Sequence, residues 1–196
     1  VYLFTGDFSG ESDGPKPLDA TRYYNRLAQR VTAALSVATA AGPLYEVDTR
    51  LRPSGSKGLL AVSIDSFVQY QREDAWTWEH MALARARPVF GSAATRAALQ
   101  QAIDTTLARP RDPAKLIADV IRMRAEMAAH KPPAGPLDAK LIDGGLVDLE
   151  FCVHAAQLEH RVGLDPHLPT AIAALVAAGL LPPDFGTAHD VLMGAP

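Results

Sequence analysis

The chain carries the segment Tyr45-Glu46-Val47-Asp48-Thr49-Arg50-Leu51-Arg52-Pro53-Ser54-Gly55, in which apolar and charged side chains alternate. Successive side chains of a β-strand point to opposite faces, so this pattern predicts a strand with one apolar face and one charged face. The charged face would present two carboxylates and two guanidiniums at intervals of about 6.7 Å. Two interpretations are open: a site for anions and cations, or an antiparallel edge strand with solvated charges.

The regions around this segment predict a small sheet covered by a helix. Val1–Phe4 has the pattern of a strand end, and the apolar run 59–64 is expected to pair with the charged strand. Asp19 is the expected N-cap of an intervening helix that Gly42 and Pro43 stop. The order strand, helix, strand, turn, strand implies an α+β fold.

The rest of the chain is predicted to be mostly helical. The expected helices span residues 65–84, 92–108, 113–130, 146–161, 170–178 and 184–193. Asp112 is the expected N-cap of the third of these, with Pro113 at its first position. Because β-branched residues become rarer beyond Gly91, we place a domain boundary there. Residues 1–91 form the domain that contains the sheet, and residues 92–196 form a helical domain that is incomplete at its C-terminal end.

Composition narrows the class of protein. The chain of 196 residues has a net charge of −3 and no long basic tract, so nucleic acid is not an expected partner. No apolar run is long enough to cross a bilayer, so we expect no membrane association. The single cysteine, Cys152, lies in an apolar run, where we expect a buried, unreactive thiol in a reducing cytoplasm. Because the chain starts at Val1 without an initiator methionine, it is expected to be a piece of a longer protein.

A set of motifs accompanies the charged segment in a defined order. After it come Tyr70-Gln71, Ala75-Trp76-Thr77-Trp78-Glu79-His80, Arg85-Ala86-Arg87, Asp138-Ala139-Lys140 and Gly144-Gly145-Leu146-Val147-Asp148-Leu149-Glu150-Phe151. Together these motifs resemble the glutamine synthetase adenylyltransferase family. Members of that family carry two nucleotidyltransferase halves, the first of which removes AMP from glutamine synthetase while the second attaches it. The Trp-Thr-Trp-Glu-His and Arg-Pro-Ser-Gly motifs are similar to the second half.

The resemblance implies a fold, a reaction and partners. Residues 1–91 would be a truncated polymerase-β-like nucleotidyltransferase domain, followed by the helical bundle. The parent enzyme would transfer AMP from ATP to a tyrosine of glutamine synthetase with Mg²⁺ as cofactor, and would thereby regulate nitrogen metabolism. Glutamine synthetase and a PII-type signalling protein would be its partners.

The resemblance also assigns a catalytic residue. Asp48 would be the third of three carboxylates that hold two magnesium ions in the polymerase-β-like fold. The other two belong to an Asp-x-Asp strand whose continuation matches Val1–Phe4, so they would lie upstream of this chain. One carboxylate does not assemble a two-metal site. We therefore predict that this polypeptide alone does not transfer AMP, although the parent enzyme does.

Supporting residues are assigned around that carboxylate. Arg50 and Arg52 share its face, where guanidiniums suit either nucleotide phosphates or a structural carboxylate such as Glu46. Lys57 lies in a Gly-rich turn that either faces a phosphate or simply connects two strands. Glu79 is a candidate structural partner for the two arginines.

The helical motif supplies a second group of supporting residues. Gly144 and Gly145 are expected to cap a helix that places Asp148 and Glu150 against the catalytic domain or its nucleotide. Glu150 and His154 are four residues apart and share a helical face, a spacing that metal ligands use but that also arises by chance. His189 and its neighbouring aspartate match a dipeptide of metal phosphohydrolases, but no companion motif supports that assignment.

Two other functions remain open at this stage. The helices of residues 92–196 could form a noncatalytic regulatory or interaction module that binds a protein. Alternatively, the parent enzyme could be a related uridylyltransferase, because those enzymes share the fold and part of the helical motif. A comparison of ATP with UTP as the nucleotide donor separates the two enzymes.

Overall fold

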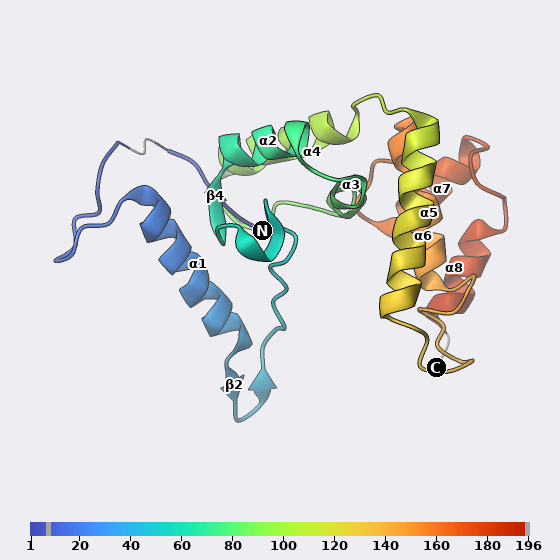
Figure 1. Ribbon diagram of the computed structural model, residues 1–196, viewed down its shortest axis with the longest axis horizontal. Coiled ribbons are helices and arrows are strands. Elements are labelled where there is room, and N and C mark those ends of the chain that lie inside the picture. The colour runs from blue at the N-terminus through green and yellow to red at the C-terminus, as the bar shows by residue number, and fades with distance from the viewer. Residues whose placement is uncertain (7–8, 195–196) are drawn as a thin grey trace. The chain divides into compact units, whose positions relative to one another are not determined.

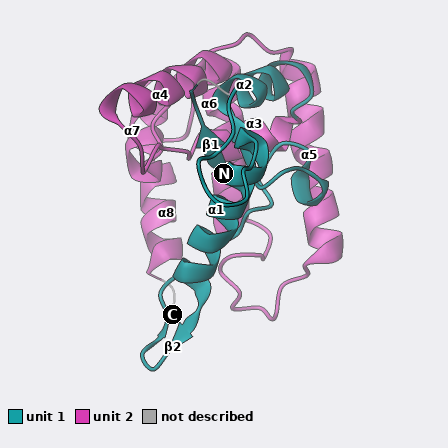
Figure 2. Cartoon of the chain, turned by 90° about the vertical axis from the view of Figure 1, so that its left-hand side faces the viewer, with its two compact units in different colours: residues 1–75 teal, residues 76–196 magenta. Residues whose placement is uncertain are grey.

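The computed structural model describes residues 1–6 and 9–194 (Figure 1). It is about 54% helical with two small sheets, which agrees with the predicted α+β class in coarse terms. The chain forms two compact units, Val1–Ala75 and Trp76–Pro196, shown in separate colours in Figure 2. We call them the N-terminal unit and the helical unit. The boundary placed after residue 91 between the sheet-containing domain and the helical domain stays a prediction.

In the N-terminal unit two short strands run parallel. Strand β1 (Tyr2–Phe4) pairs with β4 (Ala61–Ser63), with Tyr2 opposite Ala61 and Phe4 opposite Ser63. Both predicted apolar runs therefore contain strands. The partner of the second run is β1, however, so its expected pairing with the charged segment is wrong.

Helix α1 (Ala20–Ser36) supplies the crossover that parallel strands require. Its predicted cap is confirmed, because the Asp19 carboxylate accepts a hydrogen bond from the Arg22 backbone N–H at 2.9 Å. Phe4 of β1 stacks on Tyr24 of α1 with ring centroids 4.5 Å apart. Ala28 completes this small core, so the inner face of α1 is held against the strands.

Three further elements complete the N-terminal unit. A tiny hairpin joins β2 (Ala38–Thr39) to β3 (Gly42–Pro43), the turn η1 spans Gly55–Lys57, and helix α2 spans Ile64–Glu73.

The charged segment does not form the predicted strand. Residues 44–50 have no regular structure, and a bend and a turn follow. Two local contacts explain the difference. The Arg50 backbone N–H donates to the Asp48 carboxylate at 2.9 Å, and the Thr49 carbonyl accepts from the Arg52 guanidinium at 2.8 Å. Backbone groups that bond to nearby side chains are not available to a strand ladder.

The helical unit is built around one central helix. Its elements are α3 (Thr77–Leu83), α4 (Ala93–Leu107), α5 (Pro113–His130), α6 (Leu146–His160), α7 (Leu168–Ala177) and α8 (Phe185–Met193). Helix α6 contacts α3, α5, α7 and α8. Val153 of α6 and Leu175 of α7 are completely buried in the core between those two helices. Residues on several sides of α6 are buried, as expected for a helix that contacts four others, while Asp148, Glu150 and Glu159 remain as charged side chains on it.

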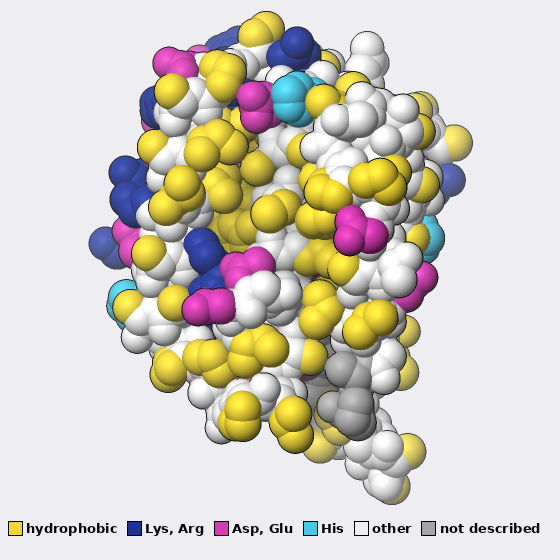
Figure 3. Space-filling model, turned by 90° about the vertical axis from the view of Figure 1, so that its right-hand side faces the viewer, with side chains coloured by type: hydrophobic (Ala, Val, Ile, Leu, Met, Phe, Trp, Pro, Cys, Tyr) yellow, Lys and Arg dark blue, Asp and Glu magenta, His cyan; other side chains and the backbone are white. Residues whose placement is uncertain are grey.

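Part of the apolar surface of the helical unit is uncovered. Ile117 and Ile121 of α5, and Val191 and Met193 of α8, are exposed. Figure 3 shows apolar side chains gathered around a hollow on this unit. No helix among the described residues is long and apolar enough to cross a lipid bilayer.

Two sequence-based expectations for this region are corrected. The single helix expected over residues 65–84 is two helices, because the chain is extended at Trp76 and the Glu79 carboxylate accepts the Trp76 N–H at 3.0 Å to start α3. Cys152 is exposed and not buried. The apolar run around it did not reveal which side of α6 stays uncovered.

Candidate functional site

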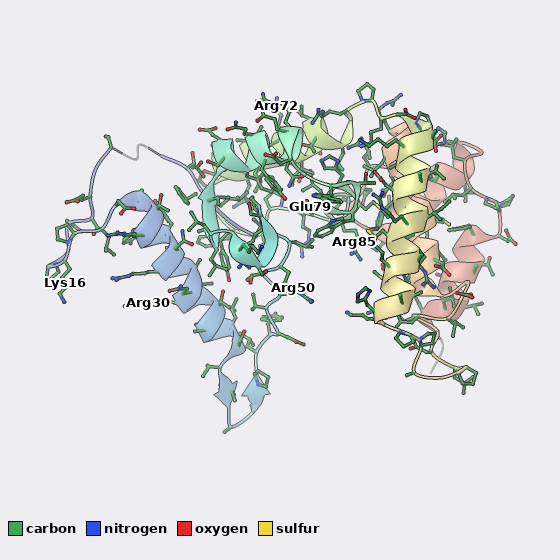
Figure 4. All side chains as sticks on the ribbon, viewed as in Figure 1. Lys16, Arg30, Arg50, Arg72, Glu79 and Arg85 are labelled. Carbon is green, nitrogen blue, oxygen red and sulfur yellow. The ribbon has the colours of Figure 1, made fainter. Side chains whose placement is uncertain are left out.

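Asp48 and Arg50 form a two-pronged ion pair in the N-terminal unit. The Arg50 Nε lies 3.0 Å from both Asp48 carboxylate oxygens, and its Nη2 lies 2.6 Å from Oδ2. Both side chains are exposed, and Arg50 is labelled in Figure 4. The hydrogen bonds to Asp48 and its charge raise the pKa of Arg50 above its ordinary value. The pair therefore fixes the direction in which this carboxylate points.

Arg52 holds the turn that follows. Its guanidinium donates to the backbone carbonyls of Thr49 at 2.8 Å, Ser56 at 3.0 Å and Gly58 at 3.1 Å. A planar fork of donors suits such a set of carbonyls. These contacts correspond to the structural alternative for Arg52, and its contact with a nucleotide stays a prediction.

The Asp48 segment does not pair with β1, whose partner strand is β4. The side chains of Glu46 and Lys57 are exposed on the same segment. The negative charge of Glu46 also raises the pKa of Arg50, but by less than Asp48 does.

In the helical unit, Asp148 anchors the start of α6. Its carboxylate accepts the Gly144 N–H at 2.7 Å and binds the Arg124 guanidinium of α5. Burial alone would raise the pKa of Asp148. The hydrogen bonds from Arg124 and Gly144 outweigh that effect, so the pKa is below its ordinary value. A carboxylate in the first turn of a helix is also stabilised by the helix dipole.

The two glycines of this motif do different things. Gly144 has a φ of +76°, a backbone conformation that is unfavourable for residues other than glycine. Gly145 is the N-cap of α6, and a Cβ there would lie 2.7 Å from the Ala139 carbonyl and 2.8 Å from the Ile142 carbonyl. Gly145 caps α6, as the sequence predicted, and Gly144 lies in the turn before it. The placement of Asp148 and Glu150 against the catalytic domain or its nucleotide stays a prediction.

Glu150 and Glu79 each have a protein partner. Glu150 pairs with Arg85, labelled in Figure 4, at 3.3 Å. Glu79 is buried and caps α3 as described above. The proposed pairing of Glu79 with Arg50 or Arg52 stays a prediction, since those residues belong to the other unit.

His154 is a buried group that the sequence singled out only for its spacing. Its Nδ1 lies 2.8 Å from Gln157 Oε1, while the Gln157 amide donates to the Gly163 carbonyl. Since the amide nitrogen of Gln157 is used in this way, its oxygen accepts from His154 and leaves Nε2 unprotonated. Nε2 has no hydrogen-bond partner among the described residues. Burial lowers the pKa of His154.

Sequence reasoning did not assign Arg124, which proves central to the α6 motif. A signal was present, because Arg124 lies four residues after Val120 and eight after Leu116, on the apolar stripe of α5. A charged residue in such a stripe usually has a partner on a neighbouring element.

The described residues do not by themselves fit a two-magnesium centre. Within residues 1–6 and 9–194, no group of three or more His, Cys, Asp or Glu side chains is arranged to hold a metal ion. Asp48 offers one carboxylate, and Arg50 occupies both of its oxygens. Two-metal centres need several carboxylates that converge.

Comparison with known proteins points to one family. The model of the family described as glutamate-ammonia ligase adenylyltransferase matches residues 1–102, which include the Asp48 segment. A relative from Brucella melitensis is 54% identical over 85% of this chain and 17% of its own length. One from Xanthomonas axonopodis is 54% identical over 94% of the chain and 21% of its own length. Both relatives are described as bifunctional glutamine synthetase adenylyltransferase/adenylyl-removing enzymes. The chain thus spans about a fifth of their length or less.

Proposed function

The chain belongs to the glutamate-ammonia ligase adenylyltransferase family, and we propose that it is part of an enzyme that transfers AMP from ATP to a tyrosine of glutamine synthetase. The proposal assigns the chain to the half of the enzyme that attaches AMP. It assigns residues 1–91 to a polymerase-β-like nucleotidyltransferase domain.

Asp48 is the residue on which this proposal depends most. The observations that support it are the two-pronged pairing of Asp48 with Arg50 and the match of this segment to the family model. In the complete enzyme, Asp48 would contribute one of the carboxylates that hold Mg²⁺. The remaining ligands would come from residues outside this chain.

Arg50 and Arg52 would support Asp48 in different ways. Arg50 would orient Asp48 because it donates hydrogen bonds to both carboxylate oxygens. Arg52 would stabilise the following turn because it donates to three backbone carbonyls. Arg50 is exposed and has only this short-range partner in the described hydrogen bonds. We propose that Arg50, and Lys57 on the adjacent turn, meet the phosphates of ATP.

Cofactor, partners and location follow from the same proposal. ATP would be the nucleotide substrate and Mg²⁺ the metal. Glutamine synthetase would be the protein substrate, a PII-type signalling protein would be a regulator, and the cytoplasm would be the site of action.

The test uses a full-length enzyme that contains this sequence. Asp48→Asn should reduce the rate of AMP transfer from labelled ATP to purified glutamine synthetase by about 100-fold or more, because loss of a ligand at a catalytic metal removes transition-state stabilisation. Removal of AMP from glutamine synthetase should stay near the wild-type rate. Asp13→Asn, the same chemical change at an exposed aspartate outside the Asp48 segment, serves as the control and should leave both rates intact.

Three results would contradict parts of the proposal. A near wild-type transfer rate for Asp48→Asn would exclude a role for Asp48 in catalysis. Transfer of UMP from UTP in preference to AMP from ATP would identify a uridylyltransferase. Magnesium-dependent transfer by this chain alone would overturn the prediction that it is inactive in isolation.

A further inference from the structure

Helix α1 carries a row of arginines on its outer side. Arg22, Arg26 and Arg30 are spaced by four residues, so they follow one side of the helix over a rise of about 12 Å. The inner side of α1 is occupied by Tyr24 and Ala28, which pack on the strands. Figure 4 shows Arg30 on the side of α1 that faces away from β4.

The arrangement of these arginines is unfavourable for the helix itself. Like charges four residues apart repel each other, and Arg22 lies in the first turn, where the helix dipole disfavours a positive charge. α1 contains no Asp or Glu. The Arg22 Nε lies 3.4 Å from the Asp19 carboxylate. Within the part of the chain that the structure describes, Arg26 and Arg30 form no ion pair. The fold therefore leaves at least two guanidiniums of this row uncompensated.

Apolar side chains lie directly beside the arginine row. Tyr23, Leu27 and Val31 each follow one of the arginines by one residue, and each is exposed by between 38 and 45%. Arginine and tyrosine are enriched in protein interfaces, where the guanidinium binds carboxylates and the aromatic ring buries a large apolar area. A simple solvated face would need the charges but not the adjoining apolar row.

We propose that this outer side of α1 is a docking surface for an acidic segment of a protein partner. The segment would present three carboxylates about 6 Å apart, as a helix with Glu at every fourth position does, and an apolar row beside them. The exposed apolar row favours a protein segment over nucleic acid as the occupant, because a phosphate backbone would pair with the arginines but leave Tyr23, Leu27 and Val31 uncovered. The proposal does not depend on the proposed AMP transfer, because it concerns binding alone.

The test is fluorescence anisotropy with a labelled helical peptide that has Glu at positions 2, 6 and 10 and Leu at positions 3, 7 and 11, added to the whole chain. Arg26→Glu combined with Arg30→Glu should weaken binding by about tenfold or more. The control combines Lys115→Glu with Lys131→Glu, two exposed lysines of the helical unit, and makes the same change in net charge. It should weaken binding by less than about twofold.

A second probe and a second variant keep the test decisive. Arg26→Gln with Arg30→Gln removes the charges without adding new ones, and circular dichroism should show an unchanged helix content for both double variants. A peptide of the same composition with its three Glu residues adjacent should bind the wild-type chain at least about fivefold more weakly, since its carboxylates do not match the arginine spacing. Equal binding of the two peptides, equal effects of the two charge reversals, or tighter binding of a single-stranded DNA 12-mer through the same arginines would overturn the proposal.

Discussion

Asp148 shows how one side chain can join two helices. It binds Arg124 of α5 and the backbone of Gly144 before α6, and its side chain is 28% exposed. Asp148 and Arg124 compensate each other's charge, so loss of either one removes the main charged partner of a partly buried side chain. The contacts that this chain provides to Asp148 therefore give it a structural role. Contact of Asp148 with a nucleotide stays a prediction.

Asp148→Asn should lower the free energy of unfolding of the helical unit by about 1–3 kcal/mol at pH 7, because hydrogen bonds to a charged group are lost. The folded pKa of Asp148 lies below its ordinary value of 3.8. Its ionisation therefore adds stability above that value, and this stability is lost as the pH falls through the lower folded pKa. Urea denaturation at pH 7 and pH 3 should show a smaller difference between wild type and variant at the lower pH. An equal difference at both values would contradict this account.

His154 should have a pH effect in a higher range. Because burial lowers its pKa below the ordinary value of 6.5, protonation favours the unfolded chain. Stability should be complete above pH 6.5 and decrease as the pH falls below it. His154→Asn keeps a donor for Gln157 but does not titrate, so the loss of stability between pH 7.5 and pH 5.5 should become smaller. An unchanged loss of stability between these pH values in the His154→Asn variant would contradict this account.

At the scale of elements, the start of α6 depends on close backbone approach. The Gly145 N–H donates to the Ile142 carbonyl at 2.9 Å, and the Leu146 N–H donates to the Ala139 carbonyl at 2.9 Å. The preceding turn is thus folded against the N-terminal start of α6. Only a residue without a side chain leaves room for it.

Gly145→Ala should destabilise the helical unit by about 1–3 kcal/mol, because its Cβ would overlap two backbone oxygens that cannot move independently. Gly144→Ala meets open space and should cost about 1 kcal/mol, from its left-handed conformation alone. Guanidinium denaturation of both variants gives the comparison. A larger loss for Gly144→Ala would show that backbone conformation, and not close approach, limits this turn.

At the scale of the whole molecule, the chain contains two units with separate cores. Phe4, Ala28 and Ala61 form the core of one unit, and the α6–α7 contact forms the core of the other. Each unit also has its own polar anchor. In the N-terminal unit it is Asn25, whose side chain accepts the N–H groups of Leu60 and Ala61 and donates to the Ala61 carbonyl at 3.0 Å.

Asn25→Ala should affect the N-terminal unit only. Removal of this amide leaves the backbone of Leu60 and Ala61 without its partner, at a cost of about 1–3 kcal/mol. Hydrogen exchange should become faster at these two amides and along α1, while the amides of α6 and α7 keep their protection. Gln29→Ala, on the exposed side of α1, is the matched control. Faster exchange in α6 as well would show that the two units unfold together.

The sequence alone determined the features that depend on neighbouring residues. The α5 helix begins at Pro113 after the Asp112 cap and ends at His130, as predicted, and Asp19 caps α1. The family was also within reach of the sequence, because its motifs are contiguous strings of residues. Caps and motifs are local, so their physical causes lie within a few positions of each other.

Tertiary structure decided what depends on distant partners. The alternation in residues 45–52 indicated a strand, but a strand exists only where another strand accepts its hydrogen bonds, and here Asp48 and Arg52 bind the local backbone. Likewise, the sequence contains both Arg124 and Asp148 but does not reveal that α5 and α6 bring them together. The same limit applies to Asp48 as a candidate site. Its residue type and motif can be read from the sequence, whereas its pairing with Arg50 in place of a strand ladder is set by the folded chain.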